Sequence, residues 1–218
     1  CYKYWKIKKK LTYNDNGLPT FINETINIYP KLPYYAFNRY KKHTTRFFDY
    51  VVNQQGHPNV VLFHSSLWSA AALAPHLHNN NIPYIITEHL KEFLLKNHLT
   101  QFQKQCIQDS YNFAFKIIAT SSALKNSIEN KFPNSKNKLS IVPNPIDETI
   151  FSLKPNIKTK TINIICIGMF RPEKRLDIVI DAIYNIIKFR KNIKLKIVGS
   201  GPLRSKLINQ IKKLNLSS

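Results

Sequence analysis

From about residue 59 onward, short apolar runs rich in β-branched residues alternate with longer stretches in which apolar residues recur every three or four positions. This alternation constrains the fold more than any other feature, because it is typical of a parallel sheet whose strands are joined by crossover helices. The runs are almost continuously apolar, which favours strands covered on both faces. We predict strands at 60–63, 84–87, 116–119, 139–142, 162–167 and 195–198.

Two of the intervening segments carry clear helix signals. Ser121, a residue type common at N-caps, precedes apolar residues spaced four apart, and the apolar residues after Pro172 recur on one helical face. We therefore predict helices after both residues. The first 58 residues are less regular, and there we predict a strand at 25–28, a turn at 30–33 and a helix at 35–52.

A proline-rich segment, VPNPIDETIFSLKPNIKTK, interrupts the alternation from Val142. Its three prolines and its turn-forming Asn and Asp residues are typical of a linker. We predict a first α/β domain at 1–150, a linker at 151–160 and a second domain at 161–218. The chain opens with Cys1, and its only Met is Met169. We therefore expect an internal fragment, with the first domain lacking its start and the second truncated.

The composition excludes several classes of protein. With 43% hydrophobic and 12% aromatic residues among 218, the chain has enough apolar surface to form a core, which excludes a disordered or low-complexity polymer. The three cysteines lie far apart, so neither a zinc site nor a redox dithiol is indicated. No apolar run approaches the ~20 residues that cross a bilayer, and the start does not resemble a signal peptide. We expect a cytoplasmic protein.

The chain is strongly basic, with 33 Lys and Arg against 12 Asp and Glu and a formal net charge of +21. A basic surface is attracted to nucleic acid or to anionic lipid head groups. The basic residues are scattered along the chain and no nucleic-acid-binding motif is visible, so we expect no nucleic-acid partner. Peripheral contact with an anionic membrane, at its inner face, is the interpretation that suits an enzyme with a membrane-embedded acceptor.

Polar residues follow two predicted strands of the first domain, at the place where ligands bind in doubly wound sheets. His64 and Ser66 follow the strand at 60–63, and Glu88 and His89 follow the strand at 84–87. We expect all four at one cleft, where an imidazole can hold a sugar hydroxyl or shift a proton. The alternative is purely structural: His64 caps its strand and His89 bonds a backbone carbonyl.

The second domain carries a candidate anion site. Gly168 follows a predicted strand, and Arg171 and Lys174 lie just before a predicted helix. Backbone N–H groups at a helix start, together with a nearby cation, can bind a phosphate without a metal. A second strand exit carries Gly199 and Gly201, which a plain structural turn explains about as well.

Several blocks, in chain order, resemble glycosyltransferase family 4, whose members have the GT-B fold of two Rossmann-like doubly wound α/β domains. The blocks are NVVLFHSSLWSAAALAPHL, IPYIITEHL, FAFKIIATSSALKNSI, VPNPIDETIF, INIICIGMFRPEKRLDIVIDAI and IKLKIVGSGPLRSKL. The resemblance runs from about residue 59 to the end and, more loosely, covers the part before. It implies a metal-independent enzyme that moves a sugar from a nucleotide-sugar donor with retention of the anomeric configuration.

The resemblance also implies roles for single residues. His89 matches the family's catalytic cleft His, which faces the donor sugar, and Lys174 matches the Lys that neutralises the donor diphosphate. Many members have Arg directly after the Gly, whereas this chain has Met169, so Arg171 is the candidate replacement. The family's usual Gly after the Lys is Arg175 here, which implies a different entry into the helix.

The function implied is a retaining glycosyltransferase that acts on a saccharide or lipid-linked acceptor in envelope polysaccharide or glycolipid synthesis. The family's Gly-rich loop would precede Cys1 and its Glu-x7-Glu motif would follow Ser218, so we expect this piece alone to be inactive. One alternative is another GT-B nucleotide-sugar enzyme, such as an epimerase, which would use carboxylates for proton transfer. Another is a non-catalytic nucleotide- or polyanion-binding module.

Overall fold

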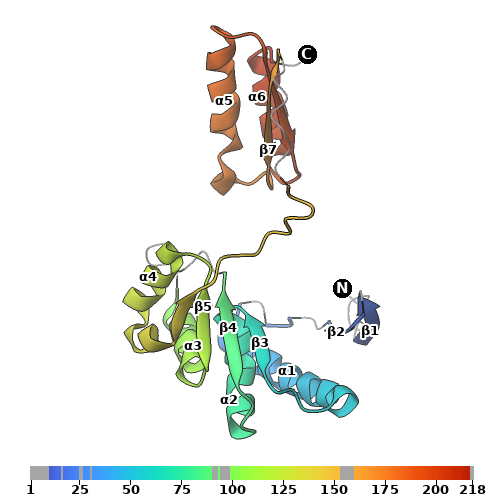
Figure 1. Cartoon of the computed structure of the whole chain (residues 1–218), viewed down its shortest axis with the longest axis vertical. Helices are drawn as coiled ribbons and strands as arrows, with labels where there is room; N and C mark the ends of the chain where they lie inside the picture. The colour runs from blue at the N-terminus through green and yellow to red at the C-terminus, as the bar shows by residue number, and fades with distance from the viewer. Residues whose placement is uncertain are drawn as a thin grey trace. The chain divides into compact units, whose positions relative to one another are not determined.

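The computed structural model describes residues 10–15, 17–24, 27–29, 31–89, 93, 99–152 and 160–216. Its chain divides into two compact units, Cys1–Ile146 and Asp147–Ser218, and each is described by itself (Figure 1). The division falls a few residues before the linker predicted at 151–160, of which residues 153–159 lie outside the described part.

Unit 1 contains a four-stranded parallel sheet. Its strands are β3 (Val61–His64), β4 (Tyr84–Glu88), β5 (Lys116–Ala119) and β6 (Leu139–Ile141), in the spatial order β3-β4-β5-β6 (Figure 1). Phe63 lies opposite Ile86, and Ile86 lies opposite Ile117, so buried apolar side chains line up across the sheet. The predicted strands are confirmed to within a residue at each end, and their carboxyl ends share one edge.

Within the described residues, the α-helices that accompany this sheet are α1 (Pro33–Gln55), α2 (Ala71–Asn79), α3 (Gln101–Asn112) and α4 (Ser122–Lys131). The predicted N-cap of α4 is confirmed, because the Ser121 hydroxyl oxygen accepts a hydrogen bond of 3.2 Å from the Leu124 N–H. At α3, Thr100 and Gln103 accept hydrogen bonds from each other's backbone N–H and form a capping box. These caps satisfy N–H groups that the first helical turn leaves without partners.

The helices do not cover both faces of the sheet equally, which corrects the expectation from the apolar runs. One face, with Tyr84 and Ile86, is buried under apolar residues of α2, α3 and α4. On the other face, Leu62 is 65% exposed. The prediction failed because a continuous apolar run does not record which face the neighbouring helices cover.

The first part of unit 1 differs most from the prediction. An antiparallel hairpin, β1 (Lys10–Asp15) and β2 (Leu18–Asn23), turns at Gly17, whose φ is 88°. The predicted helix at 35–52 is confirmed as α1. The strand predicted at 25–28 is wrong at Asn27 and Ile28, and residues 25 and 26 lie outside the described part. The predicted turn includes residue 30, also outside it, and a hydrogen bond joins Leu32 N to Tyr29 O nearby.

Unit 2 pairs two parallel strands, β7 (Ile162–Ile167) and β8 (Ile193–Val198), with α5 (Leu176–Ile187) and α6 (Arg204–Lys213). Its core forms where both helices pack on the sheet, around Phe170, Leu176, Ile180 and Leu207. The opposite sheet face is exposed: Ile165 is 61% and Ile167 is 74% exposed. Here too the expectation of two covered faces is wrong within the described residues.

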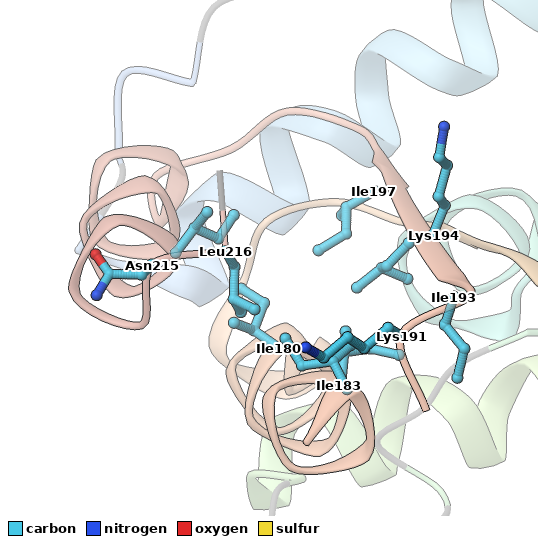
Figure 2. Close-up of a pocket in the computed structure, with 11 residues that line it drawn as sticks. Ile180, Ile183, Lys191, Ile193, Lys194, Ile197, Asn215 and Leu216 are labelled. Carbon is cyan, nitrogen blue, oxygen red and sulfur yellow. The ribbon is translucent and has the colours of Figure 1, made fainter. Parts of the chain in front are cut away.

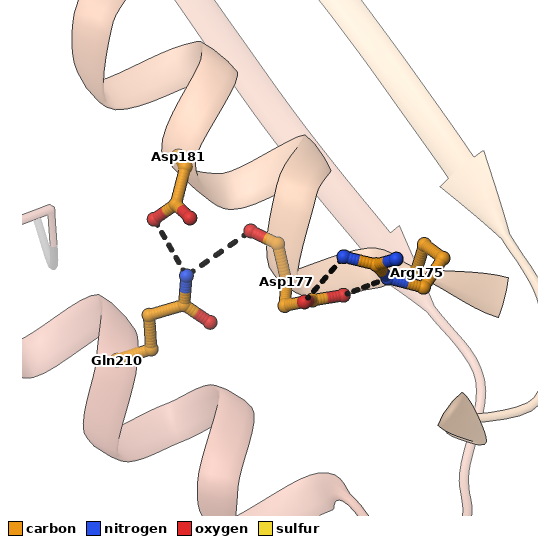
Figure 3. Close-up of polar contacts among 4 residues, drawn as sticks. All are labelled: Arg175, Asp177, Asp181 and Gln210. Atoms are coloured by element: carbon orange, nitrogen blue, oxygen red, sulfur yellow. Dashed lines mark hydrogen bonds and ion pairs between the residues drawn. The ribbon is translucent and has the colours of Figure 1, made fainter. Parts of the chain in front are cut away.

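Unit 2 also contains a partly open apolar cavity of about 640 Å³. Figure 2 shows Ile180 and Ile183 of α5 facing Ile197 of β8 across it, with Leu216 beyond α6 closing one side. A polar contact joins the two helices elsewhere. The Gln210 side-chain amide donates to the backbone oxygen of Asp177 at 3.0 Å and to Asp181 Oδ1 at 2.7 Å (Figure 3).

Within the residues that the structure describes, none of the helices combines the length and the apolar character needed to pass through a membrane.

Candidate functional site

Two histidines come together at the carboxyl edge of the unit 1 sheet. His64 ends β3, His89 follows β4, and the His64 Nδ1 atom lies 3.5 Å from the His89 Nε2 atom. The two rings are nearly parallel, with centroids 5.7 Å apart and an interplanar angle of 22°. Both side chains are exposed, so this imidazole pair can reach a ligand from solvent. The structure thus brings His64 and His89 to one place, as the sequence predicts.

The turn after β3 has an unusual backbone. Ser65 has a φ of 97°, and Trp68, inside the short turn η2 (Ser66–Ala70), has φ 69° and ψ −71°. Non-glycine residues in such conformations cost about 1–3 kcal/mol each, so surrounding contacts must hold them. The Ser65 N–H donates to Thr87 O of β4 at 2.8 Å, and the Ser69 hydroxyl donates to Ser65 O at 2.9 Å.

A buried carboxyl group, that of Glu88, accepts a hydrogen bond from the backbone of this turn. Glu88 ends β4 and is 0% exposed, and its Oε1 atom accepts hydrogen bonds from the Ser66 N–H at 3.0 Å and the Tyr111 hydroxyl at 2.8 Å. Burial raises the pKa of Glu88 above its usual value near 4.5, while the bonds from Ser66 and Tyr111 oppose the rise. Burial and the nearby Glu88 charge raise the pKa of Tyr111 well above 10, so its hydroxyl remains a donor.

Ser66 and Glu88 therefore differ from the cleft-lining role that the sequence predicts. Both are 0% exposed, and a ligand in solvent meets neither side chain in this structure. For Glu88 the reason is the alternation of a strand, because Tyr84, Ile86 and Glu88 share the face that the helices cover. Their contribution to the edge is indirect, because the Glu88 carboxylate holds the backbone that carries His64 into η2.

In unit 2, the predicted anion-binding residues lie on one exposed loop after β7. Gly168 donates its N–H to Val198 O at 3.0 Å, and the chain then passes through a single tight turn, η5 (Pro172–Lys174), before α5. Arg171 and Lys174 flank this turn, and both side chains are exposed. A methyl group on Gly168 would meet no atom within 4 Å, so open space lies above this strand exit.

The second strand exit packs directly against the first. A Cβ atom on Gly199, whose φ is 154°, would lie 1.9 Å from the Gly168 carbonyl oxygen. A Cβ atom on Gly201, whose φ is 151°, would lie 2.7 Å from the Phe170 carbonyl oxygen. The Phe170 N–H also donates to Ser200 O at 2.8 Å. Gly199 and Gly201 are thus the residues that let two loop backbones touch.

The start of α5 is less open to an anion than the sequence suggests. Arg175 precedes the helix in a left-handed conformation, with φ 47°, and its guanidinium contacts the Asp177 carboxylate at 3.3 and 3.4 Å (Figure 3). The bonds from Arg175 lower the pKa of Asp177. Because a carboxylate already occupies this first turn, Lys174 and Arg171 are better placed to meet a phosphate than the helix N-terminus.

Comparison with known proteins decides the family. The model of Glycosyltransferase Family 4 matches residues 11–149, more than half of the chain, and the model of Glycosyl transferases group 1 matches residues 147–218. The chain belongs to glycosyltransferase family 4. A curated relative, an uncharacterized glycosyltransferase of Methanocaldococcus jannaschii, is 29% identical over 143 residues, which cover 63% of this chain and 35% of the relative. The chain thus spans about a third of that relative's length.

Solved structures share the GT-B fold with this family 4 chain. The catalytic domain of starch synthase IV from Arabidopsis thaliana, bound to ADP and acarbose, has a TM-score of 0.64 at 12% identity and covers 94% of this chain and 57% of its own. HepE of Anabaena, in complex with UDP and glucose, has a TM-score of 0.59 at 13% identity, and the match covers 89% of this chain and 66% of HepE. A putative UDP-N-acetylglucosamine 2-epimerase of Listeria monocytogenes has a TM-score of 0.52 at 10% identity, and the match covers 89% of this chain and 52% of the epimerase.

Sequence reasoning missed Tyr111 in this family 4 chain. The residue lies on α3, 23 positions from Glu88, and only the packing of α3 on the sheet brings its hydroxyl to the carboxylate. Its signal was weak, since an aromatic residue on a helix normally indicates core packing. Among the described residues, no three His, Cys, Asp or Glu side chains gather in a way that would hold a metal ion.

Proposed function

We propose that this chain is part of a retaining, metal-independent glycosyltransferase that moves a sugar from a nucleotide-sugar donor to a saccharide or lipid-linked acceptor. The observation that carries the proposal is the order of the two family models, with the first on residues 11–149 and the second on 147–218. Residues 1–150 would then form the acceptor-side domain, and residues 161–218 would form the first half of the donor-binding domain.

The donor diphosphate is proposed to bind the loop that carries Gly168, Arg171 and Lys174. The two cations are exposed, and the absent side chain of Gly168 leaves space for close approach to the backbone. As the bond to the sugar breaks, negative charge builds on the departing nucleoside diphosphate, and a fixed cation stabilises it. Bound ADP and UDP in two structures of the same fold support a nucleotide in this role.

His89 is proposed as the group that faces the transferred sugar, with His64 beside it. The contact of 3.5 Å between a nitrogen of each ring gives His89 a neighbour that can orient it, which suits a residue that must present one nitrogen to a hydroxyl. Glu88 and Ser66 act here as positioning residues through the turn after β3. Gly199 and Gly201 support the donor loop rather than contact the donor.

The acceptor is proposed to be a saccharide or lipid-linked saccharide of envelope polysaccharide or glycolipid synthesis, reached from the cytoplasmic face of the membrane. The formal charge of +21 favours peripheral contact with anionic lipid. The fold alone does not separate a transferase from an epimerase, because both are among the similar structures. The match to two transferase family models favours transfer.

The proposal is tested at Lys174 by calorimetric titration of the 218-residue chain with UDP, ADP and GDP. Lys174→Ala should weaken binding of the preferred diphosphate by about tenfold or more, because it removes a charge-assisted contact from the phosphate. Lys188→Ala, which removes the same charge from an exposed position at the end of α5, is the matched control and should bind as the parent does.

Equal diphosphate affinity in both variants would remove Lys174 from the donor site. Turnover is then followed with labelled UDP-sugar and ADP-sugar donors and a panel of saccharide and lipid-linked acceptors, using the longest natural chain that carries these residues. Transfer with retained anomeric configuration in the presence of a chelator supports the proposal. Interconversion of the donor sugar without an acceptor would support the epimerase instead.

A further inference from the structure

A basic groove lies on α1 and shares no lining residue with either of the two loops described above. It has a volume of about 500 Å³ and is lined by Tyr29, Asn38, Arg39, Lys42, His43 and Arg46. All six residues belong to unit 1, and five of them come from α1. The groove is therefore a separate feature from the histidine pair and the donor loop.

The cations of the groove are gathered on one face of the helix. Arg39, Lys42 and Arg46 are spaced by three and four residues, which places them above one another along α1. None of the six lining residues is acidic. The single carboxylate of α1, Asp49, instead lies 2.8 Å from His76 Nε2 of α2. Like charges at this spacing repel one another, and an anion bound among them would relieve the repulsion.

Two of the groove's cations are arginines, although most basic residues of the chain are lysines. Only 6 of its 33 basic residues are Arg, and two of them lie seven positions apart in this groove. A planar guanidinium donates two parallel hydrogen bonds to a phosphate, whereas lysine offers a point charge. The Nε atom of Arg39 is buried and has no hydrogen-bond partner in the described part of the chain. A buried N–H donor without a partner costs free energy, and a ligand oxygen that accepts its hydrogen bond would recover that cost.

Two of the groove's lining residues are neutral. Tyr29 and Asn38 add a hydroxyl and an amide to the cations. The Tyr29 ring contacts the Tyr35 ring at a centroid distance of 6.0 Å, and Tyr34 and Tyr35 are 60% and 58% exposed. Aromatic faces beside a cationic pocket suit a ligand that joins a charged phosphate to a less polar body.

We propose that this groove binds a phosphate ester, with the phosphate held by Arg39, Lys42 and Arg46. The phosphate can belong to a lipid headgroup or to a soluble phosphorylated compound, and the shared chemistry is the phosphate monoester or diester. The binding itself does not depend on sugar transfer. Its use in holding a phosphate-bearing acceptor rests on the proposed function.

The test uses the 218-residue chain and two kinds of probe. Soluble binding is measured by calorimetry with sn-glycerol 3-phosphate, and membrane binding by co-sedimentation with phosphatidylcholine vesicles with and without phosphatidylglycerol. Arg39→Gln combined with Arg46→Gln should weaken whichever binding is found by about tenfold or more. Arg190→Gln combined with Lys104→Gln removes the same charge from exposed positions outside the groove and should bind as the parent does.

A third variant separates a built site from general attraction. Arg39→Lys combined with Arg46→Lys keeps the net charge but loses both guanidinium forks, and its binding should also fall. Circular dichroism confirms that each variant folds. In either assay, the parent and the control should bind more tightly than the Gln and Lys variants. Saturable binding of glycerol 3-phosphate that follows this ranking supports a soluble ligand. Binding only to phosphatidylglycerol vesicles, with the same ranking, supports a lipid headgroup.

The proposal is overturned if neither probe binds, if the control loses as much as the groove variants, or if the lysine variant binds as well as the parent. Lys174→Ala provides the link to the proposed function. It should weaken diphosphate binding and leave glycerol 3-phosphate or vesicle binding unchanged. Undiminished diphosphate binding in Lys174→Ala would contradict the proposed function alone, whereas undiminished binding of the probes in the Arg39→Gln and Arg46→Gln double variant would contradict the groove proposal alone.

Discussion

At the scale of single residues, Glu88 shows how a buried carboxyl group can hold the backbone beside His64 without reaching solvent. Its Oε1 atom takes two hydrogen bonds, while its Oε2 atom is buried and has no hydrogen-bond partner in the described part of the chain. A charge in such a place is costly, and the cost raises the carboxyl pKa. The stability of unit 1 should therefore depend on pH through this residue.

Glu88→Gln isolates that dependence, because a Gln oxygen can accept the same two bonds without a charge. In the parent, the raised folded-state pKa means that the folded chain keeps the Glu88 proton to higher pH than the unfolded chain does. The free energy of unfolding therefore falls as pH rises above about 4.5, until the folded-state pKa is passed. The variant lacks this fall, so its stability relative to the parent should increase with pH.

Urea unfolding followed by tryptophan fluorescence measures this difference, since both tryptophans of the chain, Trp5 and Trp68, belong to unit 1. If the difference in free energy of unfolding between parent and variant stays constant from pH 4.5 to 8, Glu88 keeps an ordinary pKa and the prediction is wrong.

At the scale of elements, the sequence predicted best where one local pattern decides the structure. The strands β3 to β7 and the cap of α4 follow from apolar runs and from Ser121. The hairpin was missed although Asn16-Gly17 is a strong turn signal, because its strands carry polar residues that mask the alternation. Burial of Glu88 was also predictable, since it shares strand parity with Tyr84 and Ile86.

Other features of the site depend on packing between distant elements, which local patterns do not contain. The bond from Tyr111 to Glu88 needs α3 to dock on β4. The contact of Arg175 with Asp177 depends on the left-handed backbone at Arg175, which no residue preference indicates. The backbone contact between the two strand exits of unit 2 requires both glycines and the pairing of β7 with β8.

That backbone contact gives a paired prediction. Gly199→Ala should destabilise unit 2 by roughly 3 kcal/mol or more, because its Cβ atom would overlap the Gly168 carbonyl oxygen at a φ that favours glycine. Gly168→Ala, on the facing strand exit, should change stability by less than about 0.5 kcal/mol, because its Cβ atom meets open space.

Thermal unfolding by circular dichroism, with hydrogen-exchange mass spectrometry of peptides within 162–213, distinguishes the two variants. If Gly168→Ala keeps its stability but binds nucleoside diphosphate more weakly, the open space above that residue belongs to the donor. Equal stability of Gly199→Ala and the parent would contradict the close contact.

At the scale of the whole molecule, the charge of +21 acts over distances that single contacts do not. Such a charge attracts any polyanion through release of counterions, so binding to immobilised heparin should fall steeply as NaCl rises. The contact proposed for Lys174 is local, so UDP affinity should fall less with salt than heparin retention does.

Lys174→Ala should weaken UDP binding but barely alter elution from heparin, since it removes one charge of many. Salt titration of both ligands, on parent and variant, checks this expectation. A UDP affinity that falls with salt as steeply as heparin retention would favour the polyanion-binding module over a donor site.

The hydrogen bond from the Ser66 N–H to Glu88 has one more consequence. Loop amides usually exchange their protons with solvent quickly, but this amide is buried and donates to a carboxylate that itself cannot reach water. Ser66 should therefore exchange as slowly as the strands beside it. The rate of deuterium uptake at the Ser66 amide therefore reports on the stability of the turn after β3. That rate should increase whenever a ligand or a substitution loosens the turn that follows His64.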